Sequence, residues 1–382
     1  MKLNIKELKD LMSKISLAVE KSKLNPKSGW IELETIGSTV GFKVANYDYY
    51  LEAGIDVGSP ITDDDKFHVT VLAETFIPLV SKLDVETVDV YERLNSLILE
   101  TEQSSYTFPI IKELGNVKCV DKIEFSPTTD KVVTIGGVEL SSVATINTKG
   151  LVDAMFSQEI QQFIYVDDQG ALTFTENMYV NDFKTKASES FKLLLNATQA
   201  KLLQIFSGES QVNIEFEQVD TFNNVATTTN KVCLSASGIK LVLICQNQDL
   251  TDKFPSIKLR ALGANVEQTH VVVDKRLLDK ALARLMVFDK KFDITIMDYS
   301  KLVFKQDCLE LVSIKNKNYE RIPYISSQNA IDHESIIRFA DLIGQLKAVT
   351  SKEIDISYGS RPAIVINSNV KQLIPEIRTR TN

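Results

Sequence analysis

The feature that most constrains this chain is a short pattern that returns once in each third of the sequence. The pattern Lys-x-Leu-x-Asp stands at residues 6–10, 149–153 and 275–279, each time at the start of a run with a helical apolar period. Such a period places the apolar side chains on one face of a helix. Thr148 and Asp274 stand where the N-caps of the second and third helices are expected. The pattern therefore predicts three similar segments, each opened by an amphipathic helix.

Two further patterns recur in the same order. In each third a β-rich stretch ends in an Asx residue, at Asn46, Asn177 and Asp307, and Asx side chains favour the end of a strand because they hydrogen-bond the following backbone. A helical segment and a strand pair then follow. The helical segments are 72–77, 196–203 and 335–343, and the strand pairs are 85–91 with 96–101, 211–217 with 231–236, and 353–358 with 363–366.

Each third thus has the order helix, strands, helix, strands. This order predicts an α+β fold in which two helices per domain pack on antiparallel sheets. Because the repeats are too long for solenoid units, we interpret them as three similar domains at 1–126, 127–253 and 254–382, with boundaries near Pro127 and Pro255. Pro78 is expected to end or kink the second helix of the first domain.

The charge of the chain is distributed unevenly. The 382 residues carry a net charge of −8, which argues against a nucleic-acid partner unless the basic residues are segregated on one face. Residues 275–291 contain six basic and two acidic residues, a net charge of +4. The apolar runs are too short to span a membrane and the N-terminus lacks a signal-peptide core, so we expect an intracellular protein.

No motif in the sequence predicts catalysis. The P-loop, dinucleotide-binding, nucleophile-elbow and zinc-protease patterns are absent. The acidic runs 63–65 and 167–168 could hold Mg²⁺ in a metal-dependent nucleic-acid enzyme, but both are typical of turns, the second of a hairpin turn. The four cysteines have no paired spacing and are interpreted as buried free thiols: Cys119, Cys233, Cys245 and Cys308. We therefore expect no catalytic residue, cofactor or metal site.

Several strings in a fixed order carry a resemblance to a known family. They are Lys-Phe-Pro at 253–255, Val-Asp-Lys-Arg-Leu-Leu at 273–278, Arg-Pro-Ala-Ile-Val-Ile at 361–366 and Leu-Ile-Pro at 373–375. With the three domains, they make the chain resemble the bacterial DNA polymerase III beta subunit, the DNA sliding clamp, over essentially its whole length. Asn-Met-Tyr-Val at 177–180 replaces the family's Asp-Gly-His-Arg, which indicates a divergent clamp of bacterial or phage origin.

The resemblance implies a processivity factor that is not an enzyme. Two copies would form a head-to-tail homodimeric ring that encircles duplex DNA without reading its sequence, is loaded by a clamp loader, and tethers the replicative polymerase and other DNA-processing proteins through short peptides. It would act in the cytoplasm of a bacterial cell, or of the infected host cell if a phage encodes it. One alternative is an interaction scaffold with the clamp fold that does not bind DNA. Another is the metal-dependent nucleic-acid enzyme.

The resemblance also implies three sets of site residues. The candidates for contact with DNA phosphates are Lys14, Lys21, Lys23, Lys82, Lys149, Lys201, Lys280, Arg284, Lys290 and Lys347. The candidates for an apolar peptide-binding groove are Tyr179, Pro255, Phe292, Tyr324, Ile364, Leu373, Ile374 and Pro375. The candidates for the dimer interface between the first and third domains are Tyr106, Phe108, Leu285, Val287 and Phe288.

Overall fold

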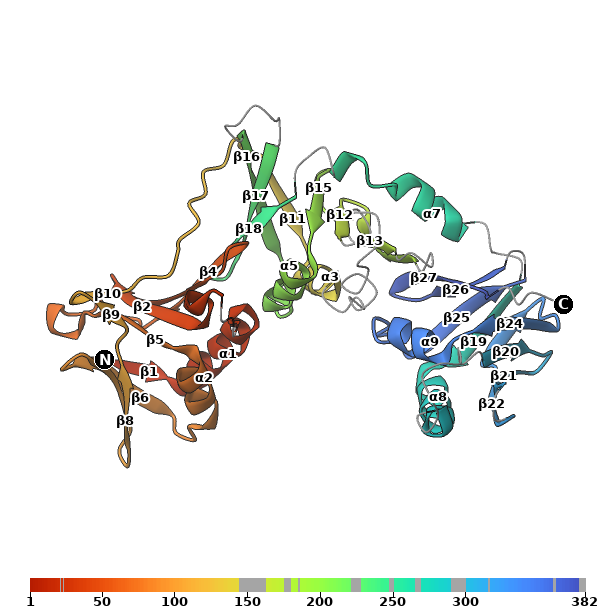
Figure 1. Cartoon of the computed structure of the whole chain (residues 1–382), viewed down its shortest axis with the longest axis horizontal. Helices are drawn as coiled ribbons and strands as arrows, with labels where there is room; N and C mark the ends of the chain where they lie inside the picture. Colours follow the sequence, from red (N-terminus) through yellow and green to blue (C-terminus); the bar gives the residue numbers. More distant parts are fainter. Residues whose placement is uncertain are drawn as a thin grey trace. The chain divides into compact units, whose positions relative to one another are not determined.

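The computed structural model divides the chain into two compact units, which are coloured along the sequence in Figure 1. It describes residues 1–20, 22, 24–143, 163–174, 180–184, 186–220, 228–246, 251–264, 269–289, 300–314, 317–359 and 362–377. Unit 1 holds Met1–Ser141, Ala187–Glu189 and Thr198–Asp249, and unit 2 holds Ser142–Lys186, Ser190–Ala197 and Leu250–Asn382. The predicted second domain is divided between these units, and the three domain boundaries stay a prediction.

Unit 1 is an assembly of antiparallel sheets and short helices. Its strands are β1 (Lys2–Asn4), β2 (Trp30–Ile36), β3 (Thr39–Ala45), β4 (Tyr49–Asp56), β5 (His68–Leu72), β6 (Thr87–Arg93), β7 (Ser96–Glu100), β8 (Ser105–Pro109), β9 (Lys112–Glu113), β10 (Asn116–Val117), β11 (Val132–Ile135), β16 (Val212–Asp220), β17 (Thr228–Ala236) and β18 (Ile239–Cys245). Its helices are α1 (Ile5–Ile15), α2 (Ala73–Lys82), α3 (Gly137–Ser142), α5 (Ala197–Leu202) and the short 3-10 helices 16–18, 26–29, 63–65 and 203–206.

The helix α1 shows how local sequence sets the layers of unit 1. The Asn4 side chain accepts hydrogen bonds from the backbone N–H groups of Lys6 at 2.9 Å and Glu7 at 3.3 Å, which caps the start of α1. Its apolar face, which includes Leu8 and Met12, is buried. This face packs on α2, on β4 and on the 3-10 helix at Leu203–Phe206.

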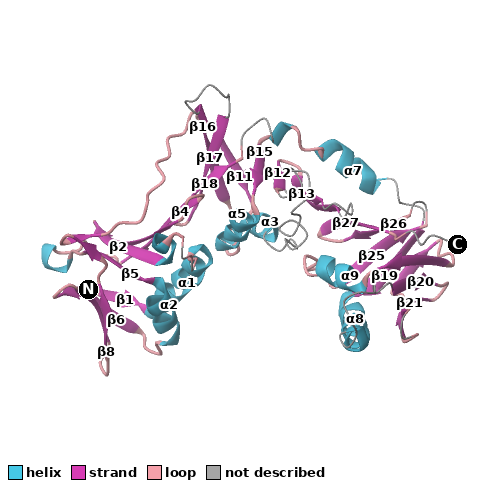
Figure 2. Cartoon of the chain, in the orientation of Figure 1, coloured by secondary structure: helices cyan, strands magenta, loops and turns pink. Residues whose placement is uncertain are grey.

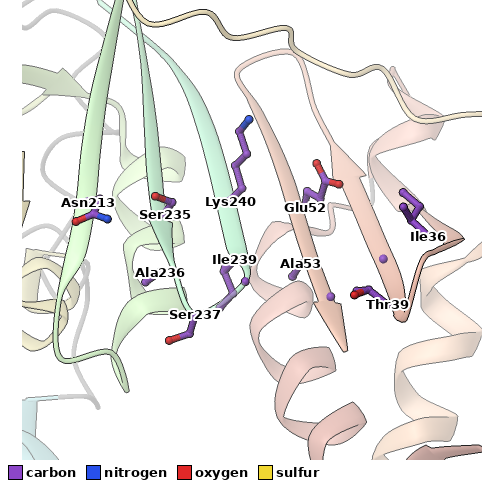
Figure 3. Close-up of a pocket in the computed structure, with 13 residues that line it drawn as sticks. Ile36, Thr39, Glu52, Ala53, Asn213, Ser235, Ala236, Ser237, Ile239 and Lys240 are labelled. Atoms are coloured by element: carbon purple, nitrogen blue, oxygen red, sulfur yellow. The ribbon is translucent and has the colours of Figure 1, made fainter. Parts of the chain in front are cut away.

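One sheet of unit 1 joins the first two thirds of the chain. Its eight strands have the order β11-β16-β17-β18-β4-β3-β2-β5, and β18 pairs with β4 in an antiparallel ladder. Polar residues directly opposite one another cross this junction, namely Asn213, Ser235, Lys240 and Glu52. Figure 3 shows them on consecutive strands, where they line a cavity of about 610 Å³. None of the predicted site residues lines this cavity.

Unit 2 has the same layered character. Its strands are β12 (Ile164–Asp167), β13 (Gly170–Phe174), β14 (Val180–Lys184), β15 (Lys192–Leu195), β19 (Thr269–Asp274), β20 (Ser300–Phe304), β21 (Cys308–Ser313), β22 (Tyr319–Pro323), β23 (Ser326–Gln328), β24 (His333–Ile337), β25 (Glu353–Tyr358), β26 (Ala363–Asn367) and β27 (Val370–Pro375). Its helices are α7 (Ser256–Ala264), α8 (Lys275–Asp289) and α9 (Phe339–Leu346).

A second shared sheet joins the last two thirds of the chain inside unit 2. It has nine strands in the order β15-β12-β13-β14-β27-β26-β25-β19-β23, and Val180 of β14 lies opposite Leu373 of β27. The helices α8 and α9 pack on each other, and α8 also contacts β19, β21 and β22. Figure 2 shows these helices in cyan against the magenta strands of the unit.

Most of the expected elements are confirmed. The fold is α+β, and α8 begins at Lys275 with the carboxylate of Asp274 accepting a hydrogen bond from the Leu277 N–H at 3.0 Å, so the predicted N-cap is correct. The turn after β12 is also confirmed as a hairpin, because Asp167 pairs with Gly170. Thr148 and the helix expected at 149–156 lie outside the described residues.

Two expectations about helix limits were wrong: that Pro78 ends its helix, and that the helix expected at 335–343 starts at Ser335. A kink at Pro78 stays a prediction. The helix α2 runs through Pro78 to Lys82; Pro78 lies on its exposed side, where solvent can reach backbone carbonyl groups that lose a helical partner. The helix expected at 335–343 begins only at Phe339, because Ser335 and its β-branched neighbours Ile336 and Ile337 belong to β24. That strand pairs with β20.

None of the helices in the described part of the chain has both the length and the apolarity that crossing a membrane requires.

Candidate functional site

The basic candidates that the structure describes share one feature. Each lies on a helix or directly after one: Lys14 on α1, Lys82 on α2, Lys201 on α5, Lys280 and Arg284 on α8, and Lys347 after α9. All are exposed except Lys14, which is half-buried. Lys21, Lys23, Lys149 and Lys290 lie outside the described residues. These helices therefore carry part of the exposed positive charge of the described residues.

Two of these cations are held by carboxylates. The Lys14 ammonium lies 3.0 Å from Glu209, and the Arg284 guanidinium binds both oxygens of Glu320 at 2.6 and 2.8 Å. The hydrogen bonds from Arg284 hold the pKa of Glu320 below its ordinary value. In the described part of the chain, Lys201, Lys280 and Lys347 have no carboxylate within ion-pair distance.

The α8 surface has two different sides. Leu278, Leu282 and Leu285 are buried against unit 2, whereas Val287 and Phe288 at the end of the helix are 61% and 52% exposed. The side chain of Leu285 is used in the core of unit 2, which does not support its prediction as a dimer-interface residue.

The candidate interface strand β8 is an edge strand of the sheet β1-β6-β7-β8. Phe108 on this strand is buried and meets Phe76 edge to face, with ring centroids 5.2 Å apart. Phe108 therefore belongs to the core of unit 1, which does not support its prediction as an interface residue. Tyr106 is half-buried, so part of its ring is accessible.

An apolar cluster in unit 2 surrounds the start of α7. We call it the α7 cluster: Tyr165, Leu172, Val180, Leu194, Phe254 and Leu259, with Phe163 and Leu373 packed at its margin. The rings of Phe254 and Tyr165 stack with centroids 4.7 Å apart and an interplanar angle of 7°. Pro255, which follows Phe254, is half-buried. The structure thus brings the peptide-groove candidate Leu373 to the segment that precedes α7.

The other groove candidates are distributed differently. Ile364 and Ile374 lie opposite each other in the β26–β27 ladder and are fully buried, so both are core residues of unit 2, which does not support a place in the groove. The Tyr324 hydroxyl donates to the Lys305 carbonyl at 3.0 Å. Pro375 is half-buried, and Tyr179 and Phe292 lie outside the described residues.

One residue at this site was not found from the sequence. Arg260 of α7 donates two hydrogen bonds, of 2.8 and 2.7 Å, to the carboxylate of Asp167. The same carboxylate accepts hydrogen bonds from the backbone N–H groups of Gln169 and Gly170 at 2.9 and 3.0 Å. This geometry fixes α7 over the β12–β13 hairpin. Because the Asp167 carboxylate is already paired with a guanidinium, the structure does not favour Asp167 as a magnesium ligand.

The other acidic run has a similar explanation. Residues 63–65 form a short 3-10 helix, where Asp63 lies 2.6 Å from the Lys66 ammonium and Asp65 lies 3.2 Å from the N-terminal ammonium. These contacts are typical of a turn on a protein surface.

No protein-family model and no curated protein matches this sequence. Solved structures do match the fold. The beta subunit of DNA polymerase from Streptococcus pyogenes is 16% identical, with 99% of each chain covered and a TM-score of 0.73. DNA polymerase III beta subunits from Thermotoga maritima (14% identity, 99% of each chain, TM-score 0.71) and Pseudomonas aeruginosa (12% identity, 99% of this chain and 100% of that chain, TM-score 0.71) are also similar. This chain therefore has the fold of the bacterial DNA polymerase III beta subunits over nearly its whole length.

Proposed function

We propose that this protein is a DNA sliding clamp, a processivity factor that encircles duplex DNA and tethers a polymerase without catalysing a reaction. The observation that carries the proposal is the match of fold over 99% of this chain to DNA polymerase III beta subunits. The positions of the exposed basic residues on helices support it, because phosphate contacts of this kind bind DNA without reading its sequence. On this proposal the protein acts in the cytoplasm of a bacterial cell or of an infected host cell.

The sheet edges support a head-to-tail homodimer. Each third of the chain contributes two groups of paired strands. One group ends in β4, β14 or β22 in the first, second and last third, and the other group ends in β8, β18 or β27. Two junctions are made within the chain, β4 with β18 and β14 with β27, and both are antiparallel. The remaining edges, β22 and β8, are the equivalents of a third junction. The strand β8 lies in the first third of the chain and β22 in the last third. Two copies that pair β22 of one with β8 of the other, twice, would therefore close a ring of two subunits.

Apolar side chains that are at least partly accessible lie beside both of these edges. Tyr106 is on β8 itself, and α8, which carries Val287 and Phe288, packs on β22. The ion pair between Arg284 of α8 and Glu320 of β22 fixes this helix to the edge strand. We therefore keep Tyr106, Val287 and Phe288 as the proposed interface residues.

The oligomeric state tests the ring directly. Light scattering at micromolar concentration should give the mass of a dimer, and a Val287→Glu, Phe288→Glu double variant should give a monomer, because two charges would be buried at the contact. Val138→Glu, a change at a 66% exposed residue of α3, is the matched control and should stay a dimer. A wild-type protein that is monomeric at every micromolar concentration measured would contradict the proposed ring.

Retention on circular DNA tests encirclement. After loading by the clamp loader of the cell that makes the protein, the wild type should remain on nicked circular duplex through gel filtration and leave when the DNA is linearised. Lys201→Glu combined with Lys280→Glu should reduce loading and retention, since phosphate contacts are lost. Lys240→Glu, on a strand of the eight-stranded sheet, should not. Retention that survives linearisation would contradict topological binding, and an unaffected double variant would favour the scaffold that does not bind DNA.

For the protein partners, we propose that peptides dock where Leu373 and Pro255 border the α7 cluster. Apolar side chains with stacked aromatic rings suit hydrophobic peptide anchors. Leu373→Ser should weaken retention of the replicative polymerase on loaded clamps while the protein remains a dimer on DNA. An unchanged polymerase affinity would place the peptide site elsewhere.

A further inference from the structure

Three side chains that could bind a metal meet on unit 1. Glu32 lies on β2, His68 begins β5, and Cys119 follows β10. Each offers one ligand atom, and these three atoms all lie within 4.8 Å of one another. The His68 Nε2 is 3.0 Å from Glu32 Oε1 and 3.8 Å from the Cys119 sulfur.

We propose that Glu32, His68 and Cys119 form a binding site for a divalent transition-metal ion, with Zn²⁺ as the best match. Zinc takes thiolate, imidazole and carboxylate ligands at about 2.3, 2.0 and 2.1 Å, which puts tetrahedral ligand atoms about 3.3 to 3.6 Å apart. The two separations measured from the His68 Nε2 differ from this range by a few tenths of an ångström, and the third, between Glu32 and Cys119, is no more than 4.8 Å. A thiolate and an imidazole favour zinc over Mg²⁺ or Ca²⁺, which prefer oxygen ligands.

The backbone holds Cys119 in place from both sides. The Lys118 carbonyl accepts a hydrogen bond from the Thr70 hydroxyl, and the Val120 N–H donates to Glu32 Oε2 at 2.9 Å. Val120 is itself buried in the core of unit 1. The segment that carries Cys119 is therefore fixed over the sheet face from which Glu32 projects, so that part of the ordering needed for metal binding is already present.

The site is open on one side. The Glu32 side chain is 6% exposed and that of His68 is 40% exposed, while Cys119 is exposed. A depression of about 670 Å³, lined in part by Glu34, His68 and Val117, reaches the imidazole from solvent. This opening provides an entry path and room for water as a fourth ligand.

The local charge suits a doubly charged cation. Lys43 lies 3.4 Å from Glu32 Oε1 and is also hydrogen-bonded to Glu34. When the metal binds, Cys119 loses its thiol proton to solvent and the sulfur forms the coordinate bond. Two carboxylates and a thiolate against one ammonium then leave two negative charges, which the ion neutralises. Lys43 keeps Glu34 as its partner when Glu32 turns to the metal.

A thiol-protection experiment tests this site on the full chain. The other three cysteines are buried, so a chromogenic disulfide reagent applied to the native protein reports on Cys119 alone. After treatment with a chelator, added Zn²⁺ should slow this reaction at least about tenfold, because a metal-bound sulfur is a poor nucleophile. Unchanged reactivity in saturating Zn²⁺ would overturn the proposal, and this measurement needs no variant.

Variants then separate the three-ligand site from a lone reactive thiol. With Co²⁺ as a probe, the wild type should show a thiolate charge-transfer band and a stoichiometry of one ion per chain, and Cys119→Ser should abolish the band. His68→Gln should lose zinc protection, whereas His270→Gln, which changes a histidine paired with Asp355 at 3.2 Å, should keep it. Protection that persists in His68→Gln would refute the three-ligand site. Dimer formation and retention on DNA are separate readouts, so failure here leaves the proposed clamp function intact.

Discussion

The ion pair between Arg260 and Asp167 allows the sharpest energetic prediction. Both side chains are largely removed from water, with 19% and 9% of their surfaces exposed, and the guanidinium makes two hydrogen bonds of 2.8 and 2.7 Å to the carboxylate. Removal of one partner from a buried pair costs about 3–5 kcal/mol. Here the cost is reduced, because Asp167 keeps the two N–H donors of Gln169 and Gly170. We expect Arg260→Met to destabilise unit 2 by about 2–3 kcal/mol.

A double-mutant cycle isolates the pair itself. Arg260→Met, Asp167→Asn and the double variant should give a coupling energy of about 2 kcal/mol in unit 2. The stability should be read from hydrogen exchange of the β12 and β13 amides, which lie in unit 2. The fluorescence of Trp30, the single tryptophan of the chain, reports on unit 1 and should be unchanged.

A coupling below about 0.5 kcal/mol, the range of exposed pairs, would refute the reasoning. It would mean that solvent reaches the pair and that α7 is held mainly by the apolar contacts of Phe254 and Leu259. If the unfolding free energy that Trp30 fluorescence reports fell by a similar amount, the two units would instead unfold together.

Three further changes test other parts of the structure. Phe254→Ala should destabilise unit 2 by about 3–4 kcal/mol in urea unfolding, because a large ring is removed from the α7 cluster. Asp274→Ala removes the N-cap of α8 and should cost about 1 kcal/mol; an unchanged unfolding midpoint would contradict the capping role. The Ser237 hydroxyl and the Lys14 ammonium hold the pKa of Glu209 below its ordinary value. The stability from these contacts is therefore present above about pH 4.5 and is lost as pH falls further through the lowered pKa, so Glu209→Gln should flatten the acid limb of a stability–pH profile, which a thermal melt at each pH would measure.

Much of the local structure could be predicted from short windows of sequence. The apolar period at 275–286 predicted α8, and alternation predicted strands such as β16 and β25, because helices and half-buried strands leave these periods in the chain itself. The cap at Asp274 and the turn at Asp167 followed from side chains that hydrogen-bond their own neighbouring backbone. The pairing of Ser335–Ile337 with β20 was missed, since a short apolar run suits either a helix or a strand until a partner strand is known.

The candidate site was predictable only in outline. The basic residues were placed on helices correctly because Lys280 and Arg284 occupy the polar positions of an amphipathic period. The burial of Phe108 and Ile374 could not be read in the same way, because an apolar residue on a strand can face a core or a partner. The same limit applies to Cys119, which was expected to be buried and is exposed.

The sequence by itself determined most of the α+β elements and the positive charge on the helix at 275–289, since each is encoded within about one element of chain. Only the tertiary structure decided that β4 pairs with β18 and β14 with β27, that Arg260 binds Asp167, and that His68 meets Cys119 from 51 residues away. The physical reason is that backbone hydrogen bonds within a helix or hairpin join near neighbours, whereas strand edges, ion pairs and ligand clusters depend on which distant surfaces exclude water together.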